Sequence, residues 1–260
     1  MKNLDFNKIM IVNFAVEERT VELSNYCFER LGFKNVITLQ GTDGFRDKFL
    51  NFAKIAVESD CDCFIRTDAD RLVFDGIFDL ILKYYQNNDA MCVEGLCFDY
   101  FMNKLRGATP HVFSRSILEM LDNDNELMPN SQKPESHFVA KVAPTDSKKF
   151  LSVKTLTNLH EYEQYPSKVC NAYLNRIYRG HKGYYDESHL KSLPEVYQNA
   201  INQAKYFALK HESKNTMDHI DFKFLDEGFH KISSDQIESL YEHYLNLYKH
   251  INKGLENKKG

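Results

Sequence analysis

The sequence predicts an α/β fold in which a mostly parallel sheet is flanked by helices and followed by a C-terminal helical extension. Up to residue 98, short apolar runs alternate with segments of helical periodicity. Such alternation is typical of a parallel sheet with crossover helices. Hydrophobic residues make up 43% of the 260 positions and charged residues 27%, which is ordinary for a globular protein and excludes disorder as the main state.

Four apolar runs predict strands, and three amphipathic segments between them predict helices. The strand ranges are 8–14, 35–39, 63–66 and 90–96, and the helix ranges are 17–31, 45–58 and 75–85. In the second helix, Phe45, Phe49 and Phe52 recur at helical spacing and define an apolar face. The carboxyl ends of parallel strands meet at one edge of the sheet, where ligands bind in folds of this class.

Beyond residue 97 the pattern is less regular. It predicts a loop at 107–111, a polar loop at 122–136, short strands at 137–143 and 150–159, and helices at 190–208 and 235–251. The chain therefore divides into a domain over residues 1–165 and a helical extension over 166–260. We expect the extension to cap the sheet and shape the acceptor side, or to form a homo-oligomer contact.

Charge and composition exclude several classes of protein. A net charge of −4 argues against a nucleic-acid partner. No apolar run approaches the roughly 20 residues that span a bilayer, and the first residues lack the features of a signal peptide, so we expect a cytoplasmic protein. The stretch 166–185 is basic and aromatic, and it predicts binding of a phosphate-bearing or lipid-linked acceptor, with peripheral contact to the inner face of a membrane. The alternative interpretation is the solvated face of a helix.

The six cysteines do not form a zinc framework. Cys61 and Cys63 are separated by one residue, whereas zinc knuckles use two to four. Most of the six lie in or beside apolar, strand-like stretches, where a thiol behaves as a small hydrophobe. We expect buried, reduced, structural thiols.

Two aspartates separated by one residue follow the third predicted strand. Asp68 and Asp70 come directly after the apolar run 63–66. Carboxylate oxygens are the ligands that Mg²⁺ and Mn²⁺ prefer, and such an ion can complete its shell with phosphate oxygens. At the carboxyl end of a strand, the pair predicts a site for a divalent metal and a diphosphate. The alternative interpretation is two solvated loop aspartates, because the tripeptide alone occurs often by chance.

Residues 44–75 resemble the centre of a GT-A glycosyltransferase, in which a helix with basic and Asn residues precedes a strand ending in a D-x-D motif. The order of elements over 8–98 is similar to the nucleotide-binding half of that fold. The resemblance implies a GT-A-like, Rossmann-like domain over 1–165, which binds a nucleotide sugar and catalyses transfer. It also implies that Asp68-Ala69-Asp70 binds Mn²⁺ or Mg²⁺ together with the diphosphate of a UDP- or GDP-sugar.

The resemblance assigns roles to individual positions. The metal ligands it implies are Asp68, Asp70 and a late histidine, for which His160 is the best match, with His111 and His137 as rivals. The donor-binding positions it implies are Asn13, Phe14, Glu17, Asp43, Arg46, Lys48, Asn51, Asp68 and Ala69. The acceptor-binding positions it implies are Thr109, His111 and Glu135.

The implied reaction moves a sugar to a hydroxyl group of a glycan, lipid or protein acceptor. A metal on the diphosphate neutralises the charge that develops on the leaving group. An inverting enzyme also needs a general base, for which Glu135 is the first candidate and Asp99 the second. A retaining enzyme needs no such base, and the sequence leaves both outcomes open.

Three other functions compete with this interpretation. A sugar nucleotidyltransferase shares the sheet, but it opens with a Gly-rich loop where this chain has no glycine. A phosphatase of the D-x-D-x-T type needs a threonine where this chain has Leu72. A non-catalytic nucleotide-sugar-binding or scaffold protein of the same fold predicts no dependence on metal. A P-loop and a G-x-S-x-G elbow are both absent from the sequence.

Overall fold

A computed structural model describes residues 4–41, 44–129, 134–142, 149–178, 186–210 and 221–256. Its centre is a sheet of seven strands in the order β2-β1-β3-β6-β5-β7-β4. The strands are β1 (Ile9–Ala15), β2 (Val36–Gln40), β3 (Cys63–Asp68), β4 (Arg71–Val73), β5 (Cys92–Asp99), β6 (Lys104–Ser114) and β7 (Phe150–His160). All but β4 and β6 run in one direction. The predicted α/β fold with a mostly parallel sheet is therefore confirmed.

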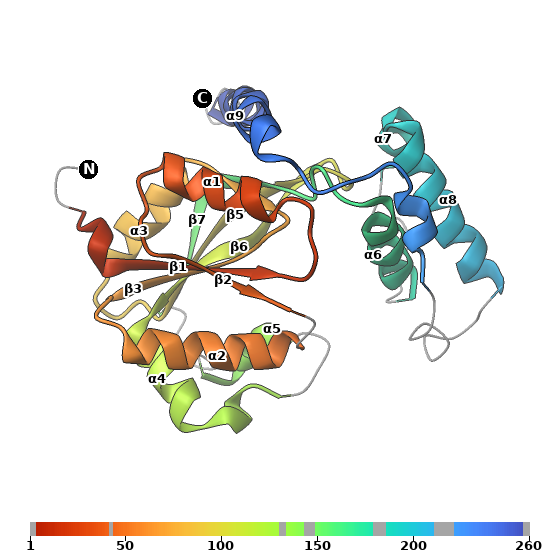
Figure 1. Ribbon diagram of the computed structural model, residues 1–260. Helices are drawn as coiled ribbons and strands as arrows, with labels where there is room; N and C mark the ends of the chain where they lie inside the picture. The colour runs from red at the N-terminus through yellow and green to blue at the C-terminus, as the bar shows by residue number, and fades with distance from the viewer. Residues whose placement is uncertain are drawn as a thin grey trace.

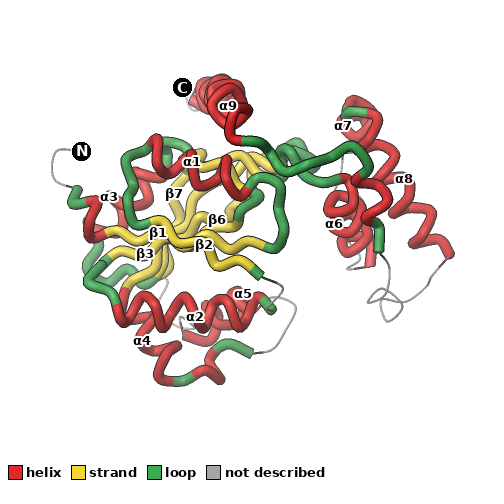
Figure 2. Tube along the Cα trace, in the orientation of Figure 1, coloured by secondary structure: helices red, strands yellow, loops and turns green. Residues whose placement is uncertain are grey.

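Helices cover both faces of the sheet (Figures 1 and 2). The helices of the described residues are α1 (Val21–Arg30), α2 (Phe45–Glu58), α3 (Ile77–Tyr85), α4 (Arg115–Asn123), α5 (Pro134–Val142), α6 (Pro166–Tyr178), α7 (Glu187–Ser192), α8 (Glu195–Lys210) and α9 (Ser234–Glu256). Short 3₁₀ turns form η1 (Phe6–Lys8), η2 (Asn125–Leu127) and η4 (Lys223–Asp226). The helices α2, α4 and α5 lie on one face, and α1, α3 and α9 lie on the other.

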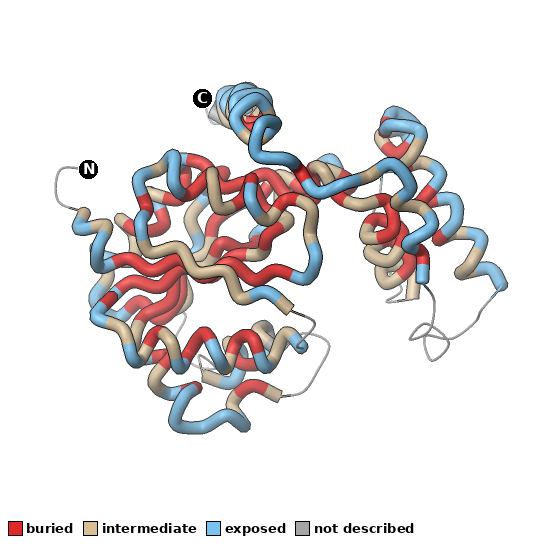
Figure 3. Tube along the Cα trace, viewed as in Figure 1, coloured by how far each residue is buried: buried red, intermediate tan, exposed pale blue. Residues whose placement is uncertain are grey.

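The sheet is buried on both faces because its strands carry apolar residues at successive positions (Figure 3). In β1, Met10 and Val12 face the core under α2, whereas Ile9 and Ile11 face the core under α1 and α3. Phe49 of α2 lies at the centre of the first core and is fully buried. Successive side chains of a strand point to opposite faces, so one continuous apolar run supplies both cores.

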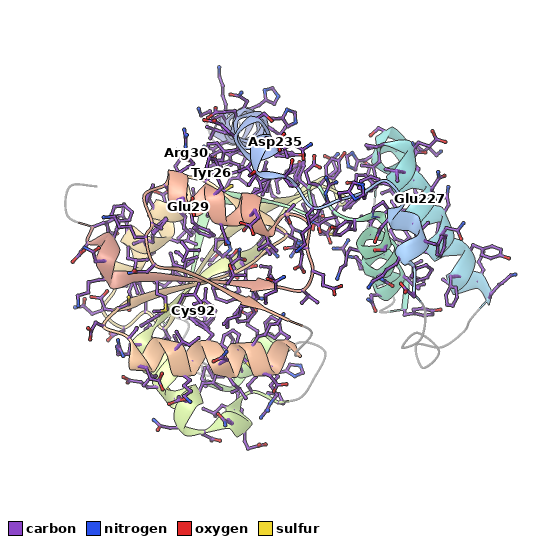
Figure 4. All side chains as sticks on the ribbon, viewed as in Figure 1. Tyr26, Glu29, Arg30, Cys92, Glu227 and Asp235 are labelled. Atoms are coloured by element: carbon purple, nitrogen blue, oxygen red, sulfur yellow. The ribbon has the colours of Figure 1, made fainter. Side chains whose placement is uncertain are left out.

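The six cysteines are buried and unpaired, as predicted. Cys92 lies in the sheet toward α2, where it belongs to the apolar core (Figure 4). Burial raises the pKa of the Cys92 thiol well above its usual value, which keeps the thiol protonated and unreactive.

The last helix, α9, returns to the sheet and packs against α1. The ring of Tyr241 lies 5.4 Å from that of Tyr26, and the guanidinium of Arg30 lies 5.2 Å from the Tyr241 ring. Figure 4 shows Tyr26 and Arg30 on α1, beneath α9. Tyr244 and Tyr248 are also buried against this face.

The helices α6, α7 and α8 form a cluster of their own beside the sheet (Figure 1). Its core includes Tyr173, Tyr197 and Phe222, together with Phe101 from the segment after β5. Among the described residues, no helix is both long enough and apolar enough to cross a membrane. The predicted domain division, peripheral membrane contact and homo-oligomer contact stay predictions.

Several local predictions are wrong. The range 137–143 lies largely in helix α5, where Phe138 and Val142 share a helical face that a short apolar run does not reveal. The predicted loop at 107–111 is part of strand β6, because its backbone pairs with both β3 and β5. A register shift between Glu94 and Gly95 accommodates the extra residues of β6. The predicted helix over 190–208 is divided into α7 and α8 by Pro194.

The position of Phe49 generates a prediction about stability. Replacing Phe49 with alanine removes a fully buried ring, and we expect unfolding by denaturant to show a loss of about 3–5 kcal/mol. Asn51 lies exposed on the same helix, so Asn51→Ala serves as the control, with a change of about 0.5 kcal/mol or less. Equal losses in the two variants would contradict the assigned core.

Candidate active site

The D-x-D segment lies at the carboxyl edge of the sheet, in the turn between β3 and β4. Strand β3 ends at Asp68, which pairs in register with Phe14 of β1. The backbone N–H of Ala69 donates to the carbonyl oxygen of Phe14 over 2.9 Å, and the hydroxyl of Thr20 donates to the Ala69 carbonyl over 2.6 Å. These bonds fix the turn, so both aspartates have defined positions.

Asp68 is surrounded by hydrogen-bond donors. Its carboxylate accepts hydrogen bonds from the guanidinium of Arg66, from Arg71 Nε over 3.4 Å and from Thr109 Oγ1 over 3.1 Å. The side chain is 29% exposed, whereas both arginines are almost fully buried. Asp68 therefore balances the charge of two interior arginines.

Asp70 has a different environment from Asp68. Its Oδ2 lies 3.3 Å from His160 Nε2, whereas its Oδ1 is buried without a hydrogen-bond partner among the described residues. Burial alone would raise the pKa of Asp70, but the charge and the hydrogen bond of His160 outweigh it and hold the pKa below its usual range. Asp70 is thus an ionised carboxylate whose Oδ1 accepts no hydrogen bond from the described residues and lies 4.0 Å from Arg71 Nε.

His160 comes to Asp70 from the last strand of the sheet. Strand β4 pairs with β7, and this register sets Arg71 opposite His160. His160 Nδ1 lies 3.0 Å from Asp99 Oδ2 and 3.0 Å from a guanidinium nitrogen of Arg106. Burial and Arg71 oppose a charge on the imidazole, but the carboxylates of Asp70 and Glu161 prevail and raise the pKa of His160 to about 9.

Asp99 orients this histidine. Its side chain is fully buried, and its two oxygens accept from the backbone N–H of Met102 and from Arg106 Nε, each over 3.0 Å. A carboxylate with this burial and these partners is placed to fix the imidazole ring. Asp99 is fully buried, so its carboxylate cannot contact an acceptor hydroxyl.

The three predicted acceptor residues converge on the other side of Asp68. Arg66 lies between the rings of Phe14 and Phe45, at 4.8 and 4.7 Å from their centroids. It also contacts Glu135 Oε2 over 3.2 Å.

Glu135 in turn lies beside His111, with 2.8 Å between Glu135 Oε1 and His111 Nδ1. Burial opposes ionisation of Glu135, but the charges of Arg66 and His111 outweigh it and lower the pKa to about 2. Both oxygens of Glu135 are therefore committed, and the carboxylate is a weak proton acceptor.

Several predicted donor-binding residues lie in the interior. Asn13 is fully buried and donates from its amide to Ser24 Oγ over 3.1 Å. Phe14 packs among the aromatic rings of α2, and Lys48 is buried with its ammonium 2.6 Å from the Ala15 carbonyl oxygen. These contacts stabilise the fold around the site.

Other predicted residues lie nearer the surface. Arg46 donates to the carbonyl oxygen of Met128 over 2.7 Å and so ties α2 to the segment after α4. Asn51 and His137 are exposed on α2 and α5. Asp43 lies outside the described residues. The donor roles of these positions stay predictions.

Two cavities lie at this edge of the sheet. The smaller has a volume of about 170 Å³, and its lining includes Asp70, Glu18, Glu161 and Lys168. The larger has a volume of about 480 Å³, and its lining includes Glu17, Gln40, Lys168, Lys223 and Lys231. Lys168 of α6 contributes to both, so the two cavities are neighbours.

Sequence reasoning missed Glu18 and Glu161 and assigned Lys168 to the acceptor side. The sequence signal that could have indicated Glu161 was its position directly after His160, at the end of a predicted strand. Glu18 and Lys168 are far apart in sequence, and only the fold brings them to one cavity.

The residues around Asp70 fit a divalent metal. Ligand atoms about 2.1 Å from a metal at right angles are about 3 Å apart, and the Asp70–His160 separation of 3.3 Å is close to this. Within the described part of the chain, Asp99, His160 and Glu161 also offer ligand atoms within 4.8 Å of one another. Asp70 is not a member of this group, and its Oδ1, which accepts no hydrogen bond from the described residues, lies 4.0 Å from Arg71 Nε.

The sequence matches no protein-family model and no curated protein sequence. Solved structures are similar at low identity, and the following are three of them. A197 from STIV is 12% identical at a TM-score of 0.44, with 58% of this chain and 85% of that chain covered. A 4-diphosphocytidyl-2C-methyl-D-erythritol synthase from Anaerococcus prevotii is 11% identical at 0.43, covering 61% and 91%. A glycosyltransferase involved in glycosylation of the major capsid of PBCV-1 is 12% identical at 0.39, covering 58% and 92%. Similarities of this size do not identify a family or a function.

The Glu135 environment generates a prediction about pH. Its lowered pKa stabilises the fold above the unfolded pKa of about 4.5, and this stability is lost as pH falls toward 2. We expect Glu135→Gln to lower the free energy of unfolding at pH 7 by up to about 3 kcal/mol.

That difference should shrink by about half at pH 3, as measured by denaturant unfolding. Glu58→Gln, at an exposed position at the end of α2, is the matched control. A Glu135→Gln deficit of equal size at pH 7 and pH 3 would contradict the assigned pairing.

Proposed function

We propose that this protein is a metal-dependent glycosyltransferase, which moves a sugar from a nucleotide-diphosphate sugar to a hydroxyl group of an acceptor. The observation that carries the proposal is the environment of Asp70. An ionised carboxylate, one oxygen of which accepts no hydrogen bond from the described residues, lies against an imidazole at the carboxyl edge of the sheet, beside a cavity. Oxygen ligands with one imidazole suit Mn²⁺ or Mg²⁺, and the D-x-D motif adds support through its resemblance to GT-A enzymes.

The two cavities support a nucleotide donor. A volume of about 480 Å³ lies in the usual range for small-molecule sites. Its lysines, Lys168, Lys223 and Lys231, offer positive charge to phosphate groups. We infer that the nucleoside, from a UDP- or GDP-sugar, occupies this larger cavity and that the diphosphate extends past Lys168 toward Asp70.

The chemistry follows from the charges at this edge. A bound divalent ion supplies Lewis-acid stabilisation to the departing diphosphate. Lys168, which lines both cavities, adds a second positive charge on the same leaving group. Asp99 and Arg106 hold the ring of His160, which in turn holds Asp70 in its position.

The acceptor lies, in this proposal, on the opposite side of Asp68. Thr109 donates to Asp68, and the His111–Glu135 pair lies beyond it. Because Glu135 is bonded to Arg66 and His111, we assign it the role of positioning His111. His111 Nε2 is buried and lies 3.7 Å from Glu94 Oε2, so in this proposal the His111–Glu135 pair shapes the acceptor side for a hydroxyl of a glycan, lipid or protein without contacting that hydroxyl through Nε2.

Release of the nucleoside diphosphate tests the proposal. The full chain is incubated with Mn²⁺ and a panel of nucleotide sugars, with simple sugars as acceptors, and the free nucleoside diphosphate is measured. We expect Asp70→Asn to lower the rate by at least about 100-fold, because it removes a ligand charge. Asp60→Asn, at an exposed site outside the cavities, should keep the wild-type rate.

Parallel mixtures, in which nucleoside triphosphates and sugar phosphates replace the nucleotide sugars, distinguish the main alternative. A sugar nucleotidyltransferase of the same fold would release pyrophosphate from a nucleoside triphosphate and a sugar phosphate. Pyrophosphate release without release of nucleoside diphosphate from any nucleotide sugar would contradict the glycosyltransferase proposal. A metal-independent binding protein would release neither product.

A further inference from the structure

The smaller cavity beside Asp70 draws its polar lining from three separate parts of the fold. Glu18 lies between β1 and α1, Gln164 lies between β7 and α6, and Lys168 lies on α6. We propose that Glu18 and Gln164 bind hydroxyl groups of the transferred sugar in this cavity and so determine which sugar is accepted. The inference rests on the proposed function, because it names the part of the donor that this cavity holds.

The volume of the smaller cavity suits one ring rather than a whole nucleotide. Sites for complete small molecules usually measure about 300–1,000 Å³. The smaller cavity, at about 170 Å³, lies below this range, whereas the larger cavity, at about 480 Å³, lies within it. Lys168 lines both cavities. A donor whose nucleoside occupies the larger cavity and whose diphosphate passes Lys168 therefore places its sugar in the smaller one.

Glu18 is held in place with one carboxylate oxygen left to accept a hydrogen bond. Its Oε2 accepts from the backbone N–H of Val16, and the chain turns sharply between them because Glu17 has a left-handed φ of 57°. Its Oε1 accepts no hydrogen bond from the described residues. Burial is the main cause that raises the pKa of Glu18, and the charge of Asp70 adds to it. A ligand hydroxyl that donates to this carboxylate stabilises its charge.

The amide of Gln164 also has its oxygen left for a ligand. The residue is 4% exposed, and its Nε2 donates to the Tyr162 carbonyl oxygen over 3.0 Å and to Thr20 Oγ1 over 3.5 Å. Both N–H groups are therefore used, whereas the amide oxygen accepts no hydrogen bond from the described residues. Because Thr20 also donates to the Ala69 carbonyl oxygen, the D-x-D turn fixes the position of this amide.

The remaining lining favours a ligand that is neutral and rich in hydroxyl groups. Phe101, Val169 and Ala172 contribute apolar surface, against which the carbon face of a sugar ring can pack. Hydroxyl groups on the ring edge can donate to the carboxylate and amide oxygens of Glu18 and Gln164. A phosphate group in the same place would meet the like charge of Glu18, which disfavours it.

Binding of nucleotide sugars and of nucleoside diphosphates tests this assignment without turnover. The full chain is titrated by calorimetry in the presence of Mn²⁺, with UDP-sugars compared with UDP and GDP-sugars compared with GDP. We expect Glu18→Ala to weaken binding of the nucleotide sugar by at least about tenfold and Gln164→Leu by about threefold or more. Binding of the nucleoside diphosphate should be unchanged in both variants. Glu29→Ala, at an exposed site on α1 (Figure 4), is the matched control and should keep both affinities.

The outcomes separate this inference from the proposed function. An unchanged affinity for the nucleotide sugar in either variant would overturn the role of that residue and leave the proposed function standing. Equal weakening of nucleotide sugar and nucleoside diphosphate would do the same, because the contact would not be with the sugar. Absence of binding of every nucleotide sugar by the wild-type protein would overturn both.

Thermal unfolding without ligand shows whether each variant is folded. If Glu18→Ala does not fold, Glu18→Gln keeps the size of the side chain and removes its charge. We expect this variant also to weaken binding of the nucleotide sugar, because a charged acceptor forms the stronger hydrogen bond. An unchanged affinity in Glu18→Gln would then overturn the assignment.

Discussion

The antiparallel pairing of β4 with β7 is the constraint on which the candidate site depends. It sets Arg71 opposite His160 and so carries the imidazole from the end of the last strand to the D-x-D turn. Without this pairing, Asp70 would lie beside Arg71 alone, and His160 would not reach it. The sheet holds charged side chains from segments far apart in sequence in fixed positions.

The two aspartates of the motif have different environments. Asp68 compensates Arg66 and Arg71, which are themselves held by aromatic rings and by the strands. Asp70 contacts the imidazole of His160 at 3.3 Å and Arg71 Nε only at 4.0 Å, and its Oδ1 accepts no hydrogen bond from the described residues. A carboxylate already bonded to two guanidinium groups is a poor metal ligand, whereas one with fewer hydrogen bonds is a better one. The first aspartate of the motif therefore has a structural role, and we propose the second as the metal ligand.

The sequence was sufficient to predict the α/β order and the location of Asp68 and Asp70 at a strand end, because periodicity and strand polarity are local properties. It was not sufficient for β6, whose glycine and proline suggested a loop, since pairing with two neighbouring strands overrides local preference. The sequence also did not identify Glu161 and Lys168 as residues that line a cavity beside Asp70. Their roles depend on which strand ends and helices meet, and no local pattern encodes that.

In the proposed function, this edge of the sheet binds a nucleoside diphosphate together with a divalent cation. The most direct measurement is thermal unfolding of the wild-type protein with a panel of nucleoside diphosphates, with and without Mn²⁺. Binding to the folded state alone raises stability by about 2.7 kcal/mol at 100 times the Kd. The account predicts a rise in Tm with one nucleotide that requires Mn²⁺. A panel in which no nucleotide changes the Tm, with or without Mn²⁺, would contradict it.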